Sequence, residues 1–161
     1  MEENRVFIDT SFFVAIFNGD DSLHRRALEV MREMNGRAYL PTTSNFIVSE
    51  TITVLSQRAS KQTALIFVDF IYHRGADMQV LTVERDLEER ALRYFSKMPS
   101  KNISFCDCVS LAVMEIFGIK KIAVSAICGI VYRGKIYCRS FSGNNNPFAS
   151  IPDTAYCQFN R

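Results

Sequence analysis

The chain has 161 residues and is 48% hydrophobic, which suits about one domain with a core of ordinary size. No apolar stretch reaches the roughly 20 residues that a bilayer-spanning helix needs, and Met1–Asn4 is polar. We therefore expect a cytoplasmic protein without a signal peptide or membrane partner. The net charge of +2 is too small to indicate nucleic-acid binding by itself. Five scattered cysteines do not suggest a disulfide framework and predict reduced thiols.

Strands and helices are expected to alternate along the first 125 residues. The apolar spacing predicts strands at 6–8, 38–40, 78–81 and 122–124, and helices at 12–17, 22–35, 45–55, 61–72, 84–97 and 105–117. This alternation is typical of an α/β fold with a parallel sheet and helices on both faces.

Capping residues define several of these boundaries. The hydroxyl side chains of Ser11, Ser22, one residue of 42–44, and Ser104 are expected to cap helix N-termini. Asn35-Gly36 is a plausible helix end, and Pro41 is expected to stop the second strand.

The remainder of the chain has a different composition. Residues 126–161 hold three of the five cysteines, two of the four prolines and a polar tract at 142–147. Residues 131–137 fit a hairpin that turns at Arg133-Gly134, and we expect loose order beyond Ser140. We therefore divide the chain into a domain at 1–125 and an atypical tail at 126–161.

Asp9 is the most informative single residue. It ends the first apolar run, so the expected strand carries its carboxylate to the C-terminal edge of the sheet. In open α/β sheets ligands bind at that edge. The alternative is a structural role, in which Asp9 caps the helix that follows.

Two further carboxylates lie in similar settings. Glu50 shares a helix face with Ile47 and Val54, where a buried carboxylate must be paired or ligated. Its alternative is a surface glutamate at the margin of the apolar stripe. Asp107 lies in the first turn of a helix, where a plain dipole-stabilising acid is the alternative. Three such carboxylates together would hold a hard divalent cation and support phosphodiester hydrolysis.

Three segments carry a resemblance to a known family. Residues 7–12, 43–50 and 104–110, the last followed by Gly118-Ile119, resemble a PIN domain, and most of all the VapC-type toxin ribonucleases of toxin–antitoxin pairs. The resemblance covers roughly residues 5–125. It implies a three-layer α/β/α sandwich with a short parallel central sheet.

The resemblance also implies an activity and its residues. It implies an endoribonuclease that depends on Mg²⁺ or Mn²⁺, with Asp9, Glu50 and Asp107 as catalytic and metal-binding positions. Thr10 or Ser11 would orient the first aspartate through a hydroxyl. The implied partners are an RNA substrate, a cognate antitoxin and a second copy of the chain in a homodimer. Because such a site is anionic, basic residues would hold RNA at its rim, and the candidates are Arg25, Arg26, Arg58 and Lys61.

One position departs from the family pattern. A fourth acidic residue is expected after the last core strand, but counting from Asp107 places it at about Ala126. Two functions therefore stay open: an active ribonuclease, and a catalytically impaired domain that binds RNA or its antitoxin. A reading-frame shift that replaced the natural C-terminus is a hypothesis for the altered composition. A third function, a phosphatase of another Asp-centred α/β family, is disfavoured because its motif needs a second aspartate two residues after Asp9, where this chain has Ser11.

Overall fold

The structure is a computed structural model that describes residues 4–74, 78–98, 103–125, 129–132 and 135–137. For the last two ranges the description is limited to the backbone and its pairing. The predicted turn at Arg133-Gly134, the polar tract, the stretch beyond Ser140 and Ala126 lie outside the described residues. The boundary at residue 125 stays a prediction.

A six-stranded sheet in the order β3-β2-β1-β4-β5-β6 forms the centre of the fold. The first four of these are parallel, and β5 and β6 continue the sheet antiparallel to β4. Strand β1 is central, because Phe7 pairs with Thr42 of β2 on one side and with Ile122 of β4 on the other. The strand bounds are β1 Arg5–Ile8, β2 Leu40–Ser44, β3 Gln79–Leu81, β4 Lys121–Val124, β5 Gly129–Tyr132 and β6 Lys135–Tyr137.

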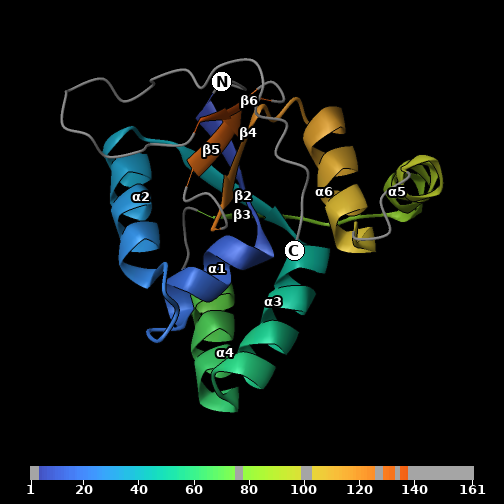
Figure 1. Cartoon of the computed structure of the whole chain (residues 1–161). Coiled ribbons are helices and arrows are strands. Elements are labelled where there is room, and N and C mark those ends of the chain that lie inside the picture. Colours follow the sequence, from blue (N-terminus) through green and yellow to red (C-terminus); the bar gives the residue numbers. More distant parts are fainter. Residues whose placement is uncertain (1–3, 75–77, 99–102, 126–128, 133–134, 138–161) are drawn as a thin grey trace.

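Helices cover both faces of this sheet. In Figure 1, α2 lies to the left of the sheet, α5 and α6 lie to the right, and α1, α3 and α4 gather below it. The helix bounds are α1 Thr10–Phe17, α2 His24–Gly36, α3 Asn45–Arg58, α4 Lys61–Asp69, α5 Arg85–Lys97 and α6 Phe105–Ile116, with a π-helical turn at Phe70–Arg74. The predicted α/β/α sandwich with a short parallel sheet is confirmed. Within the described residues, no helix is both long and apolar enough to cross a membrane.

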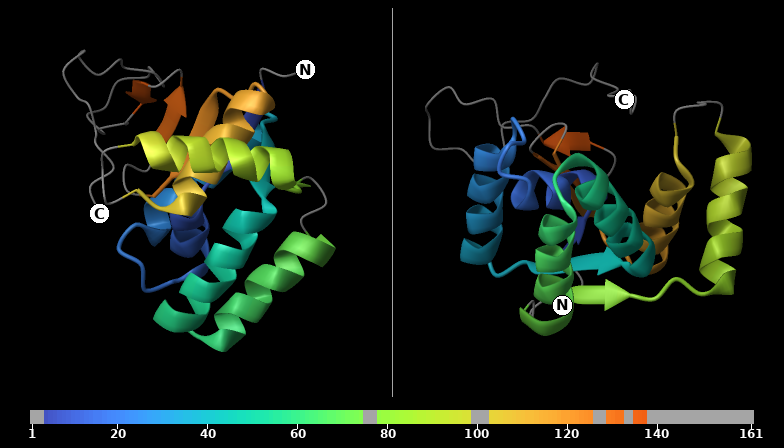
Figure 2. Two further views of the ribbon diagram at one scale, coloured as in Figure 1. Left: turned by 90° about the vertical axis from the view of Figure 1, so that its right-hand side faces the viewer. Right: turned by 90° about the horizontal axis from the view of Figure 1, so that it is seen from below.

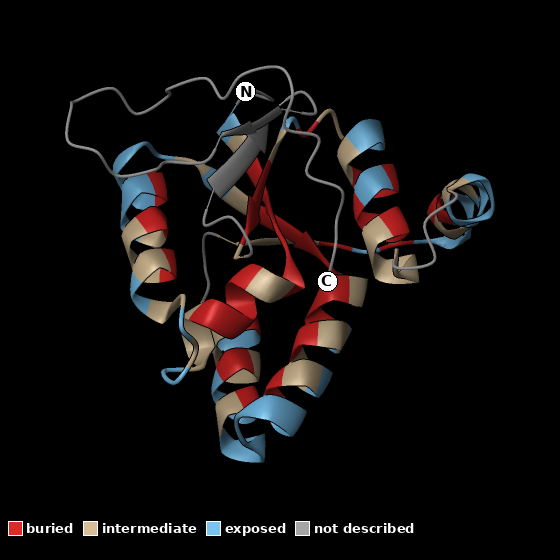
Figure 3. Cartoon of the chain, viewed as in Figure 1, coloured by how far each residue is buried: buried red, intermediate tan, exposed pale blue. Residues whose placement is uncertain are grey.

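The core is continuous from the central strand to the helices around it (Figure 3). Val6, Phe7 and Ile8 of β1 are fully buried, as expected for the centre of a parallel sheet. On the helical side, Phe67 of α4 contacts Phe13 of α1 edge to face, with ring centroids 5.1 Å apart. This packing fixes α1 directly below the end of β1, which holds the residues at their junction in place.

Three predicted boundaries are wrong. Ser11 does not cap the first helix, because it lies inside α1 and the N-cap is Asp9. Pro41 does not stop the second strand, because β2 runs from Leu40 to Ser44. Pro41 is paired with Val6 near the start of β2, before pairing with β3 begins at Thr42, and proline is tolerated near a strand start. Ser22 does not cap α2, whose N-cap is Leu23; the Asp21 side chain instead accepts a hydrogen bond from the backbone N–H of Leu23.

The other expected elements agree closely with the structure. Ser44 and Ser104 cap α3 and α6 as predicted, while α2 extends through Gly36 to a C-cap at Arg37. Strands β5 and β6 form the predicted hairpin. Since β5 also pairs with β4, the sheet continues past residue 125.

Candidate active site

Asp9 connects β1 to α1. Its backbone N–H donates to the carbonyl of Ala123, 3.1 Å away, which continues the β1–β4 pairing by one residue. Its carboxylate caps α1, because Oδ2 accepts hydrogen bonds from the backbone N–H of Ser11 at 3.1 Å and from Ser11 Oγ at 2.7 Å. Asp9 is only 8% exposed. Asp9 is therefore the helix cap that the alternative interpretation described, and as a cap its carboxylate still lies at the C-terminal edge of the sheet.

Ser11 ties this carboxylate to a second strand. Its Oγ donates to Asp9 and accepts a hydrogen bond from the backbone N–H of Ser125, 3.1 Å away. Ser125 directly follows β4, so one hydroxyl joins the ends of two neighbouring strands. The position of the Asp9 carboxylate is consequently set by the sheet as well as by α1.

Glu50 reaches the same region from α3. The hydroxyl of Thr10, the first residue of α1, donates a hydrogen bond to Glu50 Oε2. Thr10 is buried and Glu50 is partly buried, which agrees with the expectation that this carboxylate must be paired. The two adjacent hydroxyls, Thr10 and Ser11, thus bind two different carboxylates.

Asp107 is held at the N-terminus of α6. It forms a capping box with Ser104: Ser104 Oγ accepts from the backbone N–H of Asp107 at 3.1 Å. In return, Asp107 Oδ2 accepts from the backbone N–H and the hydroxyl of Ser104, each at 2.8 Å. The carboxylate is therefore oriented by its own helix end, where the dipole favours negative charge.

Cys106 lies within electrostatic range of all three carboxylates. Burial raises the pKa of this thiol to about 11, and the negative charges of Glu50, Asp107 and Asp9 add to the effect in that order. One side chain thus experiences charges delivered by β1, α3 and α6, which lie far apart in the sequence. Cys106 is a free cysteine, and the sequence pattern gave no reason to place it at the site.

The donor set fits a hard divalent cation in kind, because carboxylate oxygens are the ligands that Mg²⁺ and Mn²⁺ prefer. Within the described residues, no three His, Cys, Asp or Glu side chains are already close enough together to hold a metal ion. Thr10 holds Glu50, and Ser104 holds Asp107. Binding a cation would therefore draw together carboxylates that repel one another in its absence.

Arg58 and Lys61, two of the four basic residues suggested for the rim, lie away from the carboxylates. Arg26 forms an ion pair with Glu29 of its own helix at 3.0 Å. Arg58 and Lys61 flank the turn between α3 and α4, which points away from the sheet in Figure 1. Arg58 is eight residues beyond Glu50, or about 12 Å along the helix axis.

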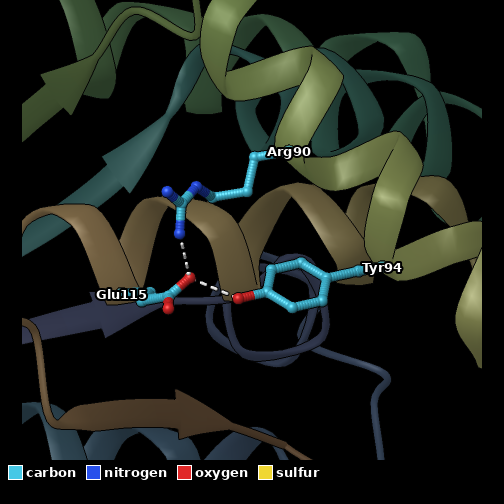
Figure 4. Close-up of polar contacts among 3 residues, drawn as sticks. All are labelled: Arg90, Tyr94 and Glu115. Carbon is cyan, nitrogen blue, oxygen red and sulfur yellow. Dashed lines mark hydrogen bonds and ion pairs between the residues drawn. The ribbon is translucent and has the colours of Figure 1, made fainter.

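Glu115 on α6 is hydrogen-bonded to two side chains of α5 (Figure 4). Arg90 Nη1 of α5 donates to Glu115 Oε2 at 2.8 Å, and the hydroxyl of Tyr94 donates to the same oxygen. These two hydrogen bonds, that of Tyr94 first, lower the pKa of Glu115. The side chain thus serves the contact between α5 and α6.

Fold and site together define an α/β/α domain with an acidic centre at the C-terminal edge of its parallel sheet. The sequence profile of the PIN-domain family matches residues 6–125, and the chain belongs to this family.

Known relatives agree with this assignment. The 23S rRNA-specific endonuclease VapC20 of Mycobacterium tuberculosis, from strains CDC 1551 / Oshkosh and H37Rv, is 31% identical over 115 residues, which are 71% of this chain and 84% of the relative. The crystal structure of M. tuberculosis VapC20, described as a sarcin-ricin loop cleaving toxin, superposes with a TM-score of 0.67 and 28% identity. That match covers 74% of this chain and 88% of VapC20.

Proposed function

We propose that this protein is a metal-dependent endoribonuclease and the toxin of a toxin–antitoxin pair. The observation that carries the proposal is geometric: the adjacent hydroxyls of Thr10 and Ser11 hold the carboxylates of Glu50 and Asp9 at the end of β1, and Ser104 holds that of Asp107 at the start of α6. Membership of the PIN family and the similarity to VapC20, a named endonuclease, support the same conclusion.

Asp9, Glu50 and Asp107 would hold Mg²⁺ or Mn²⁺. When bound, such a cation supplies a Lewis acid that polarises water and the scissile phosphate near neutral pH. The chain's own contribution is orientation: Ser11 fixes the Asp9 carboxylate, and Thr10 fixes that of Glu50. The reaction adds water across a phosphodiester bond, so the leaving oxygen gains a proton and the phosphate keeps one new oxygen.

The relatives suggest a substrate and partners. VapC20 is named for 23S rRNA, so we propose structured ribosomal RNA as the substrate class. An RNA substrate implies action in the cytoplasm. We further propose that a cognate antitoxin inhibits the protein and that the chain forms a homodimer.

The alternative function is a catalytically impaired domain that binds RNA or its antitoxin. It is favoured by Ala126, which occupies the place where the family pattern has a fourth acid. Asp9, Glu50 and Asp107 alone would then bind a cation too weakly to support cleavage.

Cleavage of total cellular RNA with Mn²⁺ tests the proposal. We would compare the parent, Asp9→Asn, Ala126→Asp and Glu115→Gln, the last as a matched loss of an acid outside the site. Discrete cleavage by the parent and Glu115→Gln, abolished in Asp9→Asn and by chelator, is the expected result. Cleavage by Ala126→Asp alone would establish the impaired alternative. Silence of all four proteins would contradict the ribonuclease assignment.

A further inference from the structure

Three phenylalanines connect three helices in a continuous chain of ring contacts. Phe105, the first residue of α6, contacts Phe46 of α3 with ring centroids 6.0 Å apart. On its other side Phe105 contacts Phe95 of α5 at 6.3 Å. Figure 2 shows the same order in space, with α6 between α3 and α5. We call these three residues the aromatic row.

Two members of the aromatic row belong to the helices that carry Glu50 and Asp107. Phe46 precedes Glu50 by four residues, so both lie on one face of α3, about 6 Å apart along the axis. Phe105 directly precedes Cys106, the thiol on which the three carboxylates act. Two of the three rings are thus attached to the same helix turns that deliver Glu50 and Asp107.

The aromatic row becomes more exposed with distance from the core. Phe46 and Phe105 are partly buried and pack against the core, whereas Phe95 is 48% exposed near the end of α5. Phe95 lies one turn after the fully buried Ala91 and continues its face of the helix. The ring planes of Phe95 and Phe105 meet at 87°, so the contact is edge to face. In such a contact one ring touches its partner only with its edge, and neither of its two faces is covered by that partner.

Stacking complements charge as a means of holding RNA here. Without a bound cation the three carboxylates repel phosphate groups, and Arg58 and Lys61 lie at the far end of α3, while Arg93 and Lys97 are the cations nearest Phe95 along α5. Stacking of a base on an aromatic ring needs no charge and accepts any base, because every base has a π-face. Ribonucleotides in loops, where bases are unpaired, are commonly held in this way.

We propose that the aromatic row is a base-stacking subsite for an unpaired nucleotide of the RNA substrate, next to the bond that is cleaved. The inference rests on the proposed ribonuclease function and adds to it how the substrate is held. Phe95 supplies the exposed ring, and Phe105 and Phe46 support it from the carboxylate side.

The test uses the full chain and a single-stranded RNA oligonucleotide that carries 2-aminopurine, whose fluorescence is quenched by stacking. Chelator is present, so that binding is measured without cleavage. Phe95→Ala and Phe95→Leu should both raise the Kd about 5- to 150-fold and lose the quenching, while Phe95→Tyr should match the parent. The change should be the same at low and high salt, because no phosphate contact is removed.

Leu92→Ala is the matched control. Leu92 is also on α5 and is 54% exposed, but it has no aromatic ring on which a base could stack, so its removal should leave the quenching unchanged. Equal binding and quenching by the parent, Phe95→Ala and Phe95→Leu would overturn the subsite and indicate that the rings contact a protein instead. If the parent quenches the probe but never cleaves RNA with Mn²⁺, the subsite stands and the ribonuclease function fails. If the parent cleaves RNA but loss of the Phe95 ring changes neither binding nor quenching, the ribonuclease function stands and the subsite fails.

Discussion

The two roles that the sequence presented as alternatives for Asp9 are chemically compatible. A helix N-cap needs a side-chain acceptor, and a cation site needs an anion; a carboxylate at the β1–α1 junction provides both. The cap is visible in the bonds from Ser11 to Asp9 Oδ2. The metal role stays a proposal, and the same cap would hold the carboxylate ready for it.

Thr10 provides a first prediction at the residue scale. Thr10→Val keeps the shape of the side chain but removes the hydroxyl that donates to Glu50, so we expect unfolding to become easier by about 2 kcal/mol. Thr10→Ser keeps the hydroxyl and should retain cleavage activity that Thr10→Val loses. Urea denaturation and RNA cleavage of both variants check this. Equal activity of the two variants would show that the hydroxyl does not position Glu50.

Cys106 gives a second prediction, which concerns alkaline pH. Its pKa is raised to about 11, so between about pH 9 and pH 11 the folded protein binds more protons than the unfolded chain. The contribution of the protonated thiol to the unfolding free energy is fully present below about pH 9 and is lost as the pH rises to about 11. The parent should therefore lose stability relative to Cys106→Ser across this range, with chelator present. A difference in unfolding free energy that does not change with pH would refute this.

At the scale of elements, Ser104 and Ser60 form a natural comparison. Both cap helices: Ser104 caps α6 beside Asp107, and Ser60 caps α4 far from the carboxylates. Replacing either with Ala should cost about 1 kcal/mol of unfolding free energy. Only Ser104→Ala also removes one of the two hydrogen bonds to the Asp107 carboxylate, leaving that from the backbone N–H, so it alone should weaken Mn²⁺ binding, by roughly 10-fold.

Thermal unfolding and calorimetric Mn²⁺ titration of both variants provide the measurement. Equal Mn²⁺ affinity in the two variants would mean that the capping box does not hold Asp107 in its binding orientation.

The sequence predicted those helix and strand boundaries that depend only on neighbouring residues, and it failed where a boundary depends on contacts elsewhere or where a neighbour takes the same role. Ser44 and Ser104 were predicted as caps because a cap needs only its own helix. Pro41 was misjudged because its tolerance depends on the register between β2 and its neighbours, which the local sequence does not show. Ser22 failed because Asp21, one residue earlier, satisfies the backbone there.

At the scale of the whole molecule, the topology decides where the Asp9 carboxylate lies. Parallel strands end at one edge of the sheet, and the acid after β1 lies at that edge; we propose that a bound cation draws the acids of α3 and α6 toward it. Alternation and the family resemblance predicted the parallel sheet, which the structure confirms, while a single site formed by the three carboxylates stays a prediction. Cys106 and the aromatic row were beyond prediction, because their contacts depend on how α3, α5 and α6 pack, and helix packing is not encoded in periodicity.

The central claim is that Asp9, Glu50 and Asp107 form one cation site, and Mn²⁺ titration by calorimetry tests it most directly because no RNA is needed. We would compare the parent with Asp107→Asn, which keeps a capping oxygen, and with Glu115→Gln on the same helix. We expect the parent and Glu115→Gln to bind Mn²⁺ alike and Asp107→Asn to bind at least about 10-fold more weakly. Equal affinity of the parent and Asp107→Asn, or no Mn²⁺ binding by the parent, would contradict the claim.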